Sequence, residues 1–243
     1  MTFSIAARCP RTGMLGVATS SKALAAAGMV PYCQTGIGAI ASQSFVNPYL
    51  GIDGLELLEH GLTAERAIER LIEGDPGRDL RQLAIVDKEG RTAAYTGDRC
   101  IPWAGHVSGA GYVCLGNILA GEDVVKAMAR SFETTLVEEL PERLILALEA
   151  GQDAGGDRRG RQSAGITVVA EETYPLCDLR VDDHSDPVPE LRRVFEVYKR
   201  EEIPFLQMMP RRNEPTPDWH NAIRLREMIE ESLREEQLAA KES

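Results

Sequence analysis

The fold is decided by the opening stretch of the chain, Met1 to Arg8, which reads MTFSIAAR. The stretch has the composition of a buried strand, and successive side chains of a strand point to opposite faces. Thr2 and Ser4 are therefore expected on one face, where both hydroxyl groups can line the same pocket. On this interpretation the chain begins inside a β-sheet.

Further strands and helices follow along the first 187 residues. Turn residues and runs of β-formers predict strands at 2–8, 14–20, 36–43, 81–86, 91–96, 163–170 and 178–181, together with a strand at Val113 that Gly116 and Asn117 close. Apolar residues at helical spacing predict helices at 55–58, 64–72, 124–132 and 138–150, with Thr63 as an N-cap. The sequence therefore mixes strands and helices within one body.

Composition and charge exclude several classes of protein. The 243 residues include 27 Lys and Arg against 38 Asp and Glu, a net charge of −11, so no nucleic-acid partner is expected. No apolar run approaches the roughly 18 residues of a membrane helix, and no signal-peptide pattern opens the chain, so neither a membrane partner nor secretion is expected. Five dispersed cysteines without a CxxC pair favour reduced thiols. These patterns predict a cytoplasmic protein.

The composition changes at residue 188. From there onward, 12 acidic and 10 basic residues occupy 56 positions. We predict a body at 1–187 and a charged helical C-terminal extension at 188–243, with helices at 189–201 and 219–238. The second helix is either a solvated arm or, through Trp219, Ile223 and Leu233, a docking surface for the body or a second subunit. A homo-oligomer is expected.

Thr2 is the strongest candidate for a catalytic residue in the sequence. A small residue after the initiator Met favours removal of Met1, which leaves Thr2 with a free α-amino group. An N-terminal Thr can use that amine, directly or through water, as the base that activates its own hydroxyl as a nucleophile. The alternative is that Met-Thr is simply a common start and Ser4 an ordinary strand hydroxyl.

A second cluster is the stretch Gly155 to Ala164, which reads GGDRRGRQSA. Arginines among glycines suit an anionic ligand, because a guanidinium group binds a carboxylate through two parallel hydrogen bonds. Arg158, Arg161 and Gln162 are candidate substrate-binding residues, and Asp157 is expected to bind a substrate amine or to orient an arginine. A solvated turn with Asp157 paired to a neighbouring Arg is the alternative.

Polar residues also follow two of the predicted strands. Ser44 and Asn47 come after one, and Asn117 closes another. Neutral donors fixed near a reacting carbonyl form an oxyanion hole, which makes Asn117 a candidate catalytic residue and Ser44 and Asn47 candidate substrate-binding residues. Turn formation is the alternative for both asparagines.

Other kinds of site lack their motifs. The sequence has no GxxxxGK[ST] loop and no GxGxxG between a strand and a helix, and its four histidines show no HExxH spacing. Neither a cofactor nor a metal is expected, and no nucleophile elbow for Ser-His-Asp catalysis is present.

Motifs in a fixed order resemble the family catalogued as domain of unknown function 1028. They lie at 1–8, 13–20, 36–43, 75–78 (DPGR), 95–97 (YTG), 101–106 (IPWAGH), 116–119 (GNIL), 155–164 and 179–184 (LRVDDH). They cover the body to about Pro187 but not the tail. That family resembles the N-terminal-nucleophile hydrolases, which implies an α+β fold: a four-layer αββα sandwich of two antiparallel sheets between two helical layers.

The same resemblance implies cleavage of a C–N bond by the N-terminal residue, so Thr2 is the expected nucleophile. Ser4, from its place on the same strand face, and Asn117, from its place at a strand end, are the other candidate catalytic residues. We predict an amidohydrolase that acts on a small amide, imide or ureido-type substrate, with a carboxylate as its expected anionic group. The alternative is a non-catalytic protein that binds a small ligand or assembles on the same fold.

Overall fold

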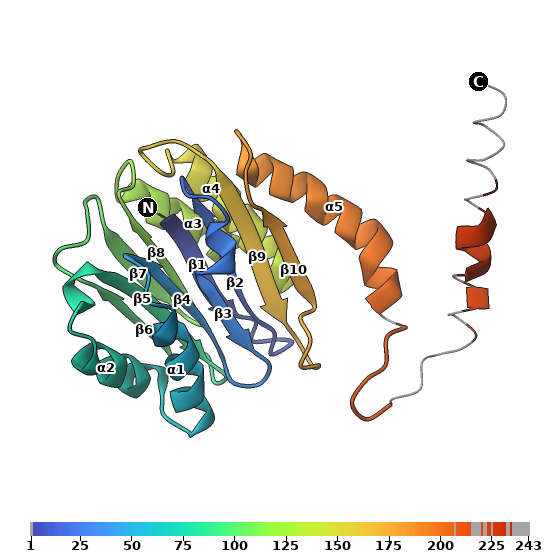
Figure 1. Ribbon diagram of the computed structural model, residues 1–243, viewed down its shortest axis with the longest axis horizontal. Helices are drawn as coiled ribbons and strands as arrows, with labels where there is room; N and C mark the ends of the chain where they lie inside the picture. The colour runs from blue at the N-terminus through green and yellow to red at the C-terminus, as the bar shows by residue number, and fades with distance from the viewer. Residues whose placement is uncertain are drawn as a thin grey trace. The chain divides into compact units, whose positions relative to one another are not determined.

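The computed structural model describes residues 2–206, 208–214, 220, 223–224, 226–231 and 234. The chain divides into two compact units, Met1–Phe195 and Glu196–Ser243. The first unit, called the body below, consists of two sheets stacked face to face with helices on their outer sides (Figure 1). The predicted α+β sandwich is confirmed.

Both sheets are antiparallel. The six-stranded sheet has the order β10-β9-β2-β1-β8-β7, and the four-stranded sheet has the order β3-β4-β5-β6. The larger sheet consists of β1 (Thr2–Arg8), β2 (Leu15–Ser21), β7 (Gly105–Gly109), β8 (Tyr112–Asn117), β9 (Ser163–Val169) and β10 (Cys177–Val181). The smaller sheet consists of β3 (Pro31–Gln34), β4 (Gly38–Ser44), β5 (Arg81–Asp87) and β6 (Thr92–Thr96). The opening stretch therefore forms a central strand, with β2 on one side and β8 on the other.

Two pairs of helices form the outer layers. α1 (Pro48–Glu59) and α2 (Ala64–Gly74) cover the four-stranded sheet, while α3 (Asp123–Thr134) and α4 (Leu140–Asp153) cover the six-stranded sheet. Two short 3₁₀ helices, η1 (Ala26–Gly28) and η2 (Arg78–Leu80), lie in connections. Thr63 caps α2 as predicted, because its hydroxyl accepts a hydrogen bond from the backbone N–H of Arg66.

Small side chains fill the space between the two sheets. Ala6, Ala39, Ala41 and Ala84 are fully buried there, together with valines and leucines from both sheets. Larger side chains pack on the helix-facing sides, where Phe3 of β1 points toward α3 and α4. Because strand residues alternate, Thr2 and Ser4 face the other sheet.

The two strands that we did not predict are edge strands. β3 begins with Pro31, and β7 has a glycine at each end, so neither resembles a strong strand former. α1 starts well before the predicted 55–58, since Gly51 and Gly54 interrupt its apolar pattern. Gly51 is required by packing, because a Cβ atom there would collide with the ring of Tyr32.

The helix α5 (Pro187–Leu206) continues past the predicted end at residue 201 and includes Pro204. Its first turns belong to the body: Val188 and Leu191 are buried, and the Arg192 guanidinium binds the carboxylates of Glu142 and Glu149 on α4. The two compact units divide within this helix, between Phe195 and Glu196, and the boundary expected at 187/188 stays a prediction.

Much of the predicted helix at 219–238 lies outside the described residues. Residues 223–224 and 226–231 are helical. Trp219 and Leu233 are not described, so a docking role for this helix stays a prediction. In the part of the chain that the structure describes, no helix has the length and apolar character needed to cross a membrane.

Gly97, at the end of β6, provides a test of the packing at the edge of the sandwich. A Cβ atom there would lie against the backbone carbonyl oxygens of Arg78 and Asp79, which cannot rotate away. We expect Gly97→Ala to lower the free energy of unfolding by about 1–3 kcal/mol. Gly74→Ala, where nothing lies within 4 Å, is the control and should change it by less than about 0.5 kcal/mol. Chemical denaturation measures both, and equal stabilities would contradict the prediction.

Candidate functional site

A row of polar side chains crosses the six-stranded sheet where β1 begins. Thr2 pairs with Asn117 of β8, and Ser21 of β2 pairs with Ser163 of β9. The Thr2 hydroxyl donates to the Ser21 hydroxyl at 3.3 Å, which joins the two pairs side by side across four strands. All four residues are buried, and Thr2 is 6% exposed. We call Thr2, Ser21, Asn117 and Ser163 the polar row.

The polar row is tied to the facing sheet by two buried amides. Gln82 Oε1 accepts hydrogen bonds from Gln43 Nε2 at 2.8 Å and from Asn117 Nδ2 at 3.0 Å. Gln82 Nε2 donates to the carbonyl oxygen of Gly116 at 2.7 Å. Gln43 Nε2 also donates to the Thr2 carbonyl oxygen at 3.2 Å. Because a fully bonded buried network fixes orientation, these amides hold both Thr2 and Asn117.

Ser4 belongs to the same network, behind Thr2. Its hydroxyl donates to Gln43 Oε1 at 2.6 Å and lies 2.8 Å from the Thr19 hydroxyl. Ser4 has no exposed surface. Thr2 and Ser4 thus lie on the same face of β1, and the Ser4 hydroxyl is enclosed by protein partners.

Two strand ends beside Thr2 have a left-handed backbone. Ser44, which follows Gln43, has a φ of 74°, and Ile118, which follows Asn117, has a φ of 50°. A β-branched residue in this conformation is strained, at a cost of about 1–3 kcal/mol. The Ile118 N–H donates to the Ile101 carbonyl at 2.9 Å, and its own carbonyl accepts from the Arg158 N–H at 3.2 Å. These bonds hold Ile118 in place despite the strain.

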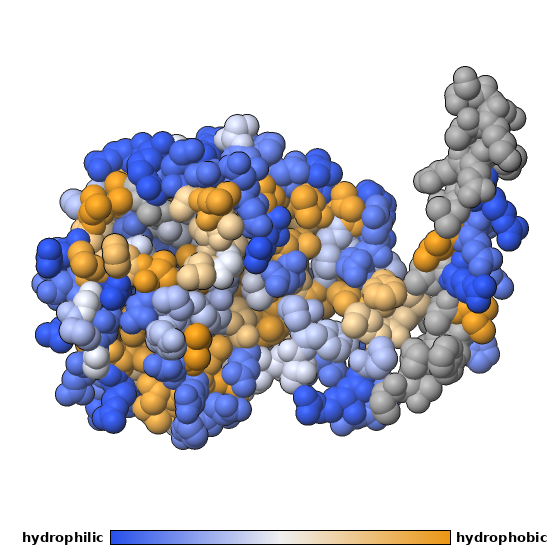
Figure 2. Space-filling view, in the orientation of Figure 1, coloured by the Kyte–Doolittle hydropathy of each residue, from blue (hydrophilic) through white to orange (hydrophobic). Residues whose placement is uncertain are grey.

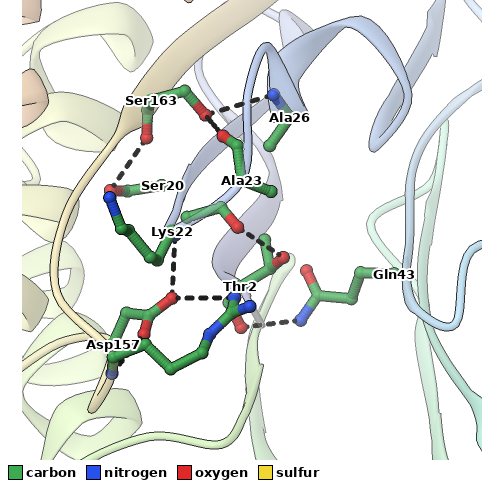
Figure 3. Close-up of polar contacts among 10 residues, drawn as sticks. Thr2, Ser20, Lys22, Ala23, Ala26, Gln43, Asp157 and Ser163 are labelled. Atoms are coloured by element: carbon green, nitrogen blue, oxygen red, sulfur yellow. Dashed lines mark hydrogen bonds and ion pairs between the residues drawn. The ribbon is translucent and has the colours of Figure 1, made fainter. Parts of the chain in front are cut away.

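Asp157 fixes the arginine-containing loop to the end of β2. Its carboxylate accepts hydrogen bonds from the backbone N–H of Lys22 at 2.8 Å and of Arg159 at 2.7 Å (Figure 3). The Arg159 guanidinium lies 3.4 Å from the same carboxylate, whose side chain is 2% exposed. Of the two roles expected for Asp157, the geometry favours orienting an arginine, since protein donors already occupy both carboxylate oxygens.

The other predicted substrate-binding residues lie in three places. Ser44 and Arg158 lie at loop ends beside the polar row, as described above. Arg161 forms an ion pair with Asp186, and Gln162 donates to Asp183 at 3.1 Å, so both hold the segment after β10. Asn47 accepts from the backbone N–H of Tyr49 as the N-cap of α1.

Asn47 also lines a separate pocket of about 440 Å³ between α1 and α2, to which Thr2 does not contribute. Its neighbour in that pocket, Asp75, is buried, and burial alone would raise the pKa of the carboxyl group. Hydrogen bonds from Arg81 and from the Gly77 N–H outweigh the burial and bring the pKa of Asp75 below its usual value. Asp75 is therefore charged at neutral pH and forms an ion pair with Arg81, whose Nε lies 2.9 Å from Asp75 Oδ2.

Sequence reasoning did not identify Gln82, Ser21 or Gln43 as partners of Thr2 and Asn117. The available signal for Gln82 was an amide at the start of the apolar run LAIV, whose continuous apolar residues indicate a strand buried on both faces. A buried amide requires partners, so it marks a polar centre. Among the described residues, no group of three His, Cys, Asp or Glu side chains could hold a metal ion.

By its fold, the protein is an αββα sandwich, in which two antiparallel sheets lie between helices and a buried polar row marks the start of a central strand. More specifically, the chain belongs to the family of unknown function DUF1028, whose model matches residues 2–191. A crystal structure of a DUF1028 protein from Silicibacter pomeroyi is 30% identical, with a TM-score of 0.82 over 89% of this chain and 98% of that one.

A weaker likeness is to Anbu, the ancestral β-subunit, from Yersinia bercovieri. It is 13% identical, with a TM-score of 0.37 over 85% of this chain and 98% of that one. A search of curated proteins found no match.

Gln82 offers a test of the network. Gln82→Met keeps the approximate size but leaves the amides of Gln43 and Asn117 without their shared acceptor. We expect a loss of about 2–4 kcal/mol in the free energy of unfolding, because each buried unsatisfied group costs about 1–3 kcal/mol. Gln162→Met, which removes a single hydrogen bond from a half-buried amide, should cost less than about 1 kcal/mol. Similar losses in the two variants would show that Gln82 is not the centre of the network.

Proposed function

We propose that the protein is an amidohydrolase that cleaves the C–N bond of a small amide, imide or ureido-type substrate with Thr2 as an N-terminal nucleophile. The observation that supports this most is the position of Thr2. Its hydroxyl lies at the start of a central strand, between Ser21 on one side and Asn117 on the other. Buried amides of the facing sheet hold its carbonyl.

In the proposed first step, removal of Met1 has freed the α-amino group of Thr2. This amine takes the proton of the Thr2 hydroxyl, directly or through a water, as Oγ1 bonds to the substrate carbonyl carbon. The carbonyl oxygen becomes an oxyanion. Asn117 can stabilise it, because Nδ2 carries two hydrogens and the bond to Gln82 uses only one.

In the second step, the C–N bond breaks and the leaving nitrogen takes the proton from the amine. The acyl group stays on Thr2 as an ester. A water molecule, activated by the same amine, then attacks the ester carbonyl, and the acid leaves as the hydroxyl of Thr2 is restored. Every step uses groups of this chain and water.

The remaining predicted residues take supporting roles in this scheme. Ser4 and Gln82 position Thr2 and Asn117 without touching substrate. Ser44 and Arg158 are the proposed substrate contacts, whereas Arg161, bound to Asp186, orders its own loop. The homo-oligomeric state and the cytoplasmic location stay predictions from the sequence.

The proposal is tested by replacing the nucleophile. Thr2→Ala should reduce hydrolysis across a panel of small amides by at least about 10³-fold, as loss of a nucleophile does in hydrolases of other folds. Thr2→Ser, which keeps a hydroxyl, should retain part of the activity. Thr134→Ala, at the exposed end of α3, is the control and should hydrolyse as the unchanged protein does.

Intact-mass measurement on the same samples should show the loss of one methionine residue. Active protein that retains Met1 would exclude Thr2 as the nucleophile. Ligand binding without turnover, equal in the unchanged protein and Thr2→Ala, would favour the alternative of a non-catalytic ligand-binding or assembly protein.

A further inference from the structure

Each residue that contacts or pairs with Thr2 is followed within two positions by a side chain that reaches the surface. These pairs are Ser21 and Lys22, Asn117 and Ile118, and Gln43 and Phe45. Ile101 and Arg158 adjoin Ile118 through its two backbone hydrogen bonds. We call Lys22, Phe45, Ile101, Ile118 and Arg158 the rim.

One side of the rim is apolar. Phe45 is 69% exposed and Ile101 is 57% exposed. Phe45 is nevertheless fixed, because its N–H donates to the Leu80 carbonyl and its own carbonyl accepts from the Arg81 guanidinium, which also lies 5.6 Å from the centre of its ring. Apolar side chains that adjoin one another at the surface are typical of binding surfaces, and Ile101 adjoins Ile118 through a backbone hydrogen bond.

The other side of the rim is cationic. Lys22 and Arg158 are both exposed, and their backbones adjoin because Asp157, next to Arg158 in sequence, accepts a hydrogen bond from the Lys22 N–H. Within the described part of the chain, neither side-chain charge has a partner, while the neighbouring Arg159 and Arg161 pair with Asp157 and Asp186. Two unpaired cations in a protein of net charge −11 favour an anion at this place.

Apolar and hydrophilic residues also lie next to each other on the face of the body seen in Figure 2. We propose that the rim selects an amide with an apolar group on one side of the C–N bond and a carboxylate on the other. This inference rests on the proposed function. Phe45, Ile101 and Ile118 contact the apolar group, Lys22 and Arg158 bind the carboxylate, and the bond between them lies over Thr2.

Binding to the Thr2→Ala protein tests the inference without turnover. The probes are N-hexanoylglycine, which has both groups, N-acetylglycine, which has only the carboxylate, and hexanamide, which has only the apolar chain. Isothermal titration calorimetry should give N-hexanoylglycine a dissociation constant at least tenfold below that of either other compound. Equal affinities, or no binding of N-hexanoylglycine, would overturn the inference.

Rim variants in the same background separate the two sides. Arg158→Gln should weaken N-hexanoylglycine and N-acetylglycine severalfold and leave hexanamide unchanged. Ile118→Gly should weaken only the two compounds with a hexanoyl chain. It removes a strained side chain, so its thermal midpoint should not fall. Lys88→Gln and Val137→Ser, exposed positions at the opposite end of the sandwich, are the matched controls.

Failure of the inference and failure of the proposed function give different results. If the unchanged protein hydrolyses all three amides at equal rates, Thr2 chemistry stands and rim selectivity is wrong. If it hydrolyses none but binds N-hexanoylglycine with the expected preference, the rim assignment stands and the nucleophile is wrong. Rim variants that behave like Lys88→Gln and Val137→Ser would refute the assignment of the rim.

Discussion

The body depends on one constraint: polar groups placed between two packed sheets must all find partners. Each amide group buried there without a hydrogen bond would cost about 1–3 kcal/mol of stability. Gln82 meets this constraint by accepting from one amide of each sheet and donating to the backbone. The relative placement of the sheets and the orientation of Thr2 are therefore set by the same hydrogen bonds.

The sequence predicted those parts of the fold that depend on local pattern. The central strands, the hairpin of β5 and β6, and the Thr63 cap follow from alternation, turn residues and side-chain chemistry within a few positions. β3 and β7 were missed because edge strands owe their form to a neighbouring strand rather than to their own composition. The prediction for α1 was too short because Gly51 interrupts the apolar pattern. That glycine is required by its contact with the ring of Tyr32, which is distant in sequence.

The candidate site was predictable in its residues but not in its connections. Thr2, Ser4 and Asn117 do come together, since all three depend on strand position. The arginines could not be told apart from sequence, because Arg158, Arg159 and Arg161 stand in one loop with the same local chemistry. Their difference comes from Asp157 and Asp186, and only the fold brings Asp186 beside Arg161.

The position of β1 has a consequence for how the chain folds. β1 is synthesised before β8, yet Thr2 pairs with Asn117, so one edge of this strand stays unpaired until more than a hundred further residues have been made. Contacts between such distant positions close slowly. Phe3 and Ile5, fully buried in the finished body, remain open to water or to other chains during that interval. The earliest segment of the body is thus among the last to be completed, and the polar row forms only when the whole sheet does.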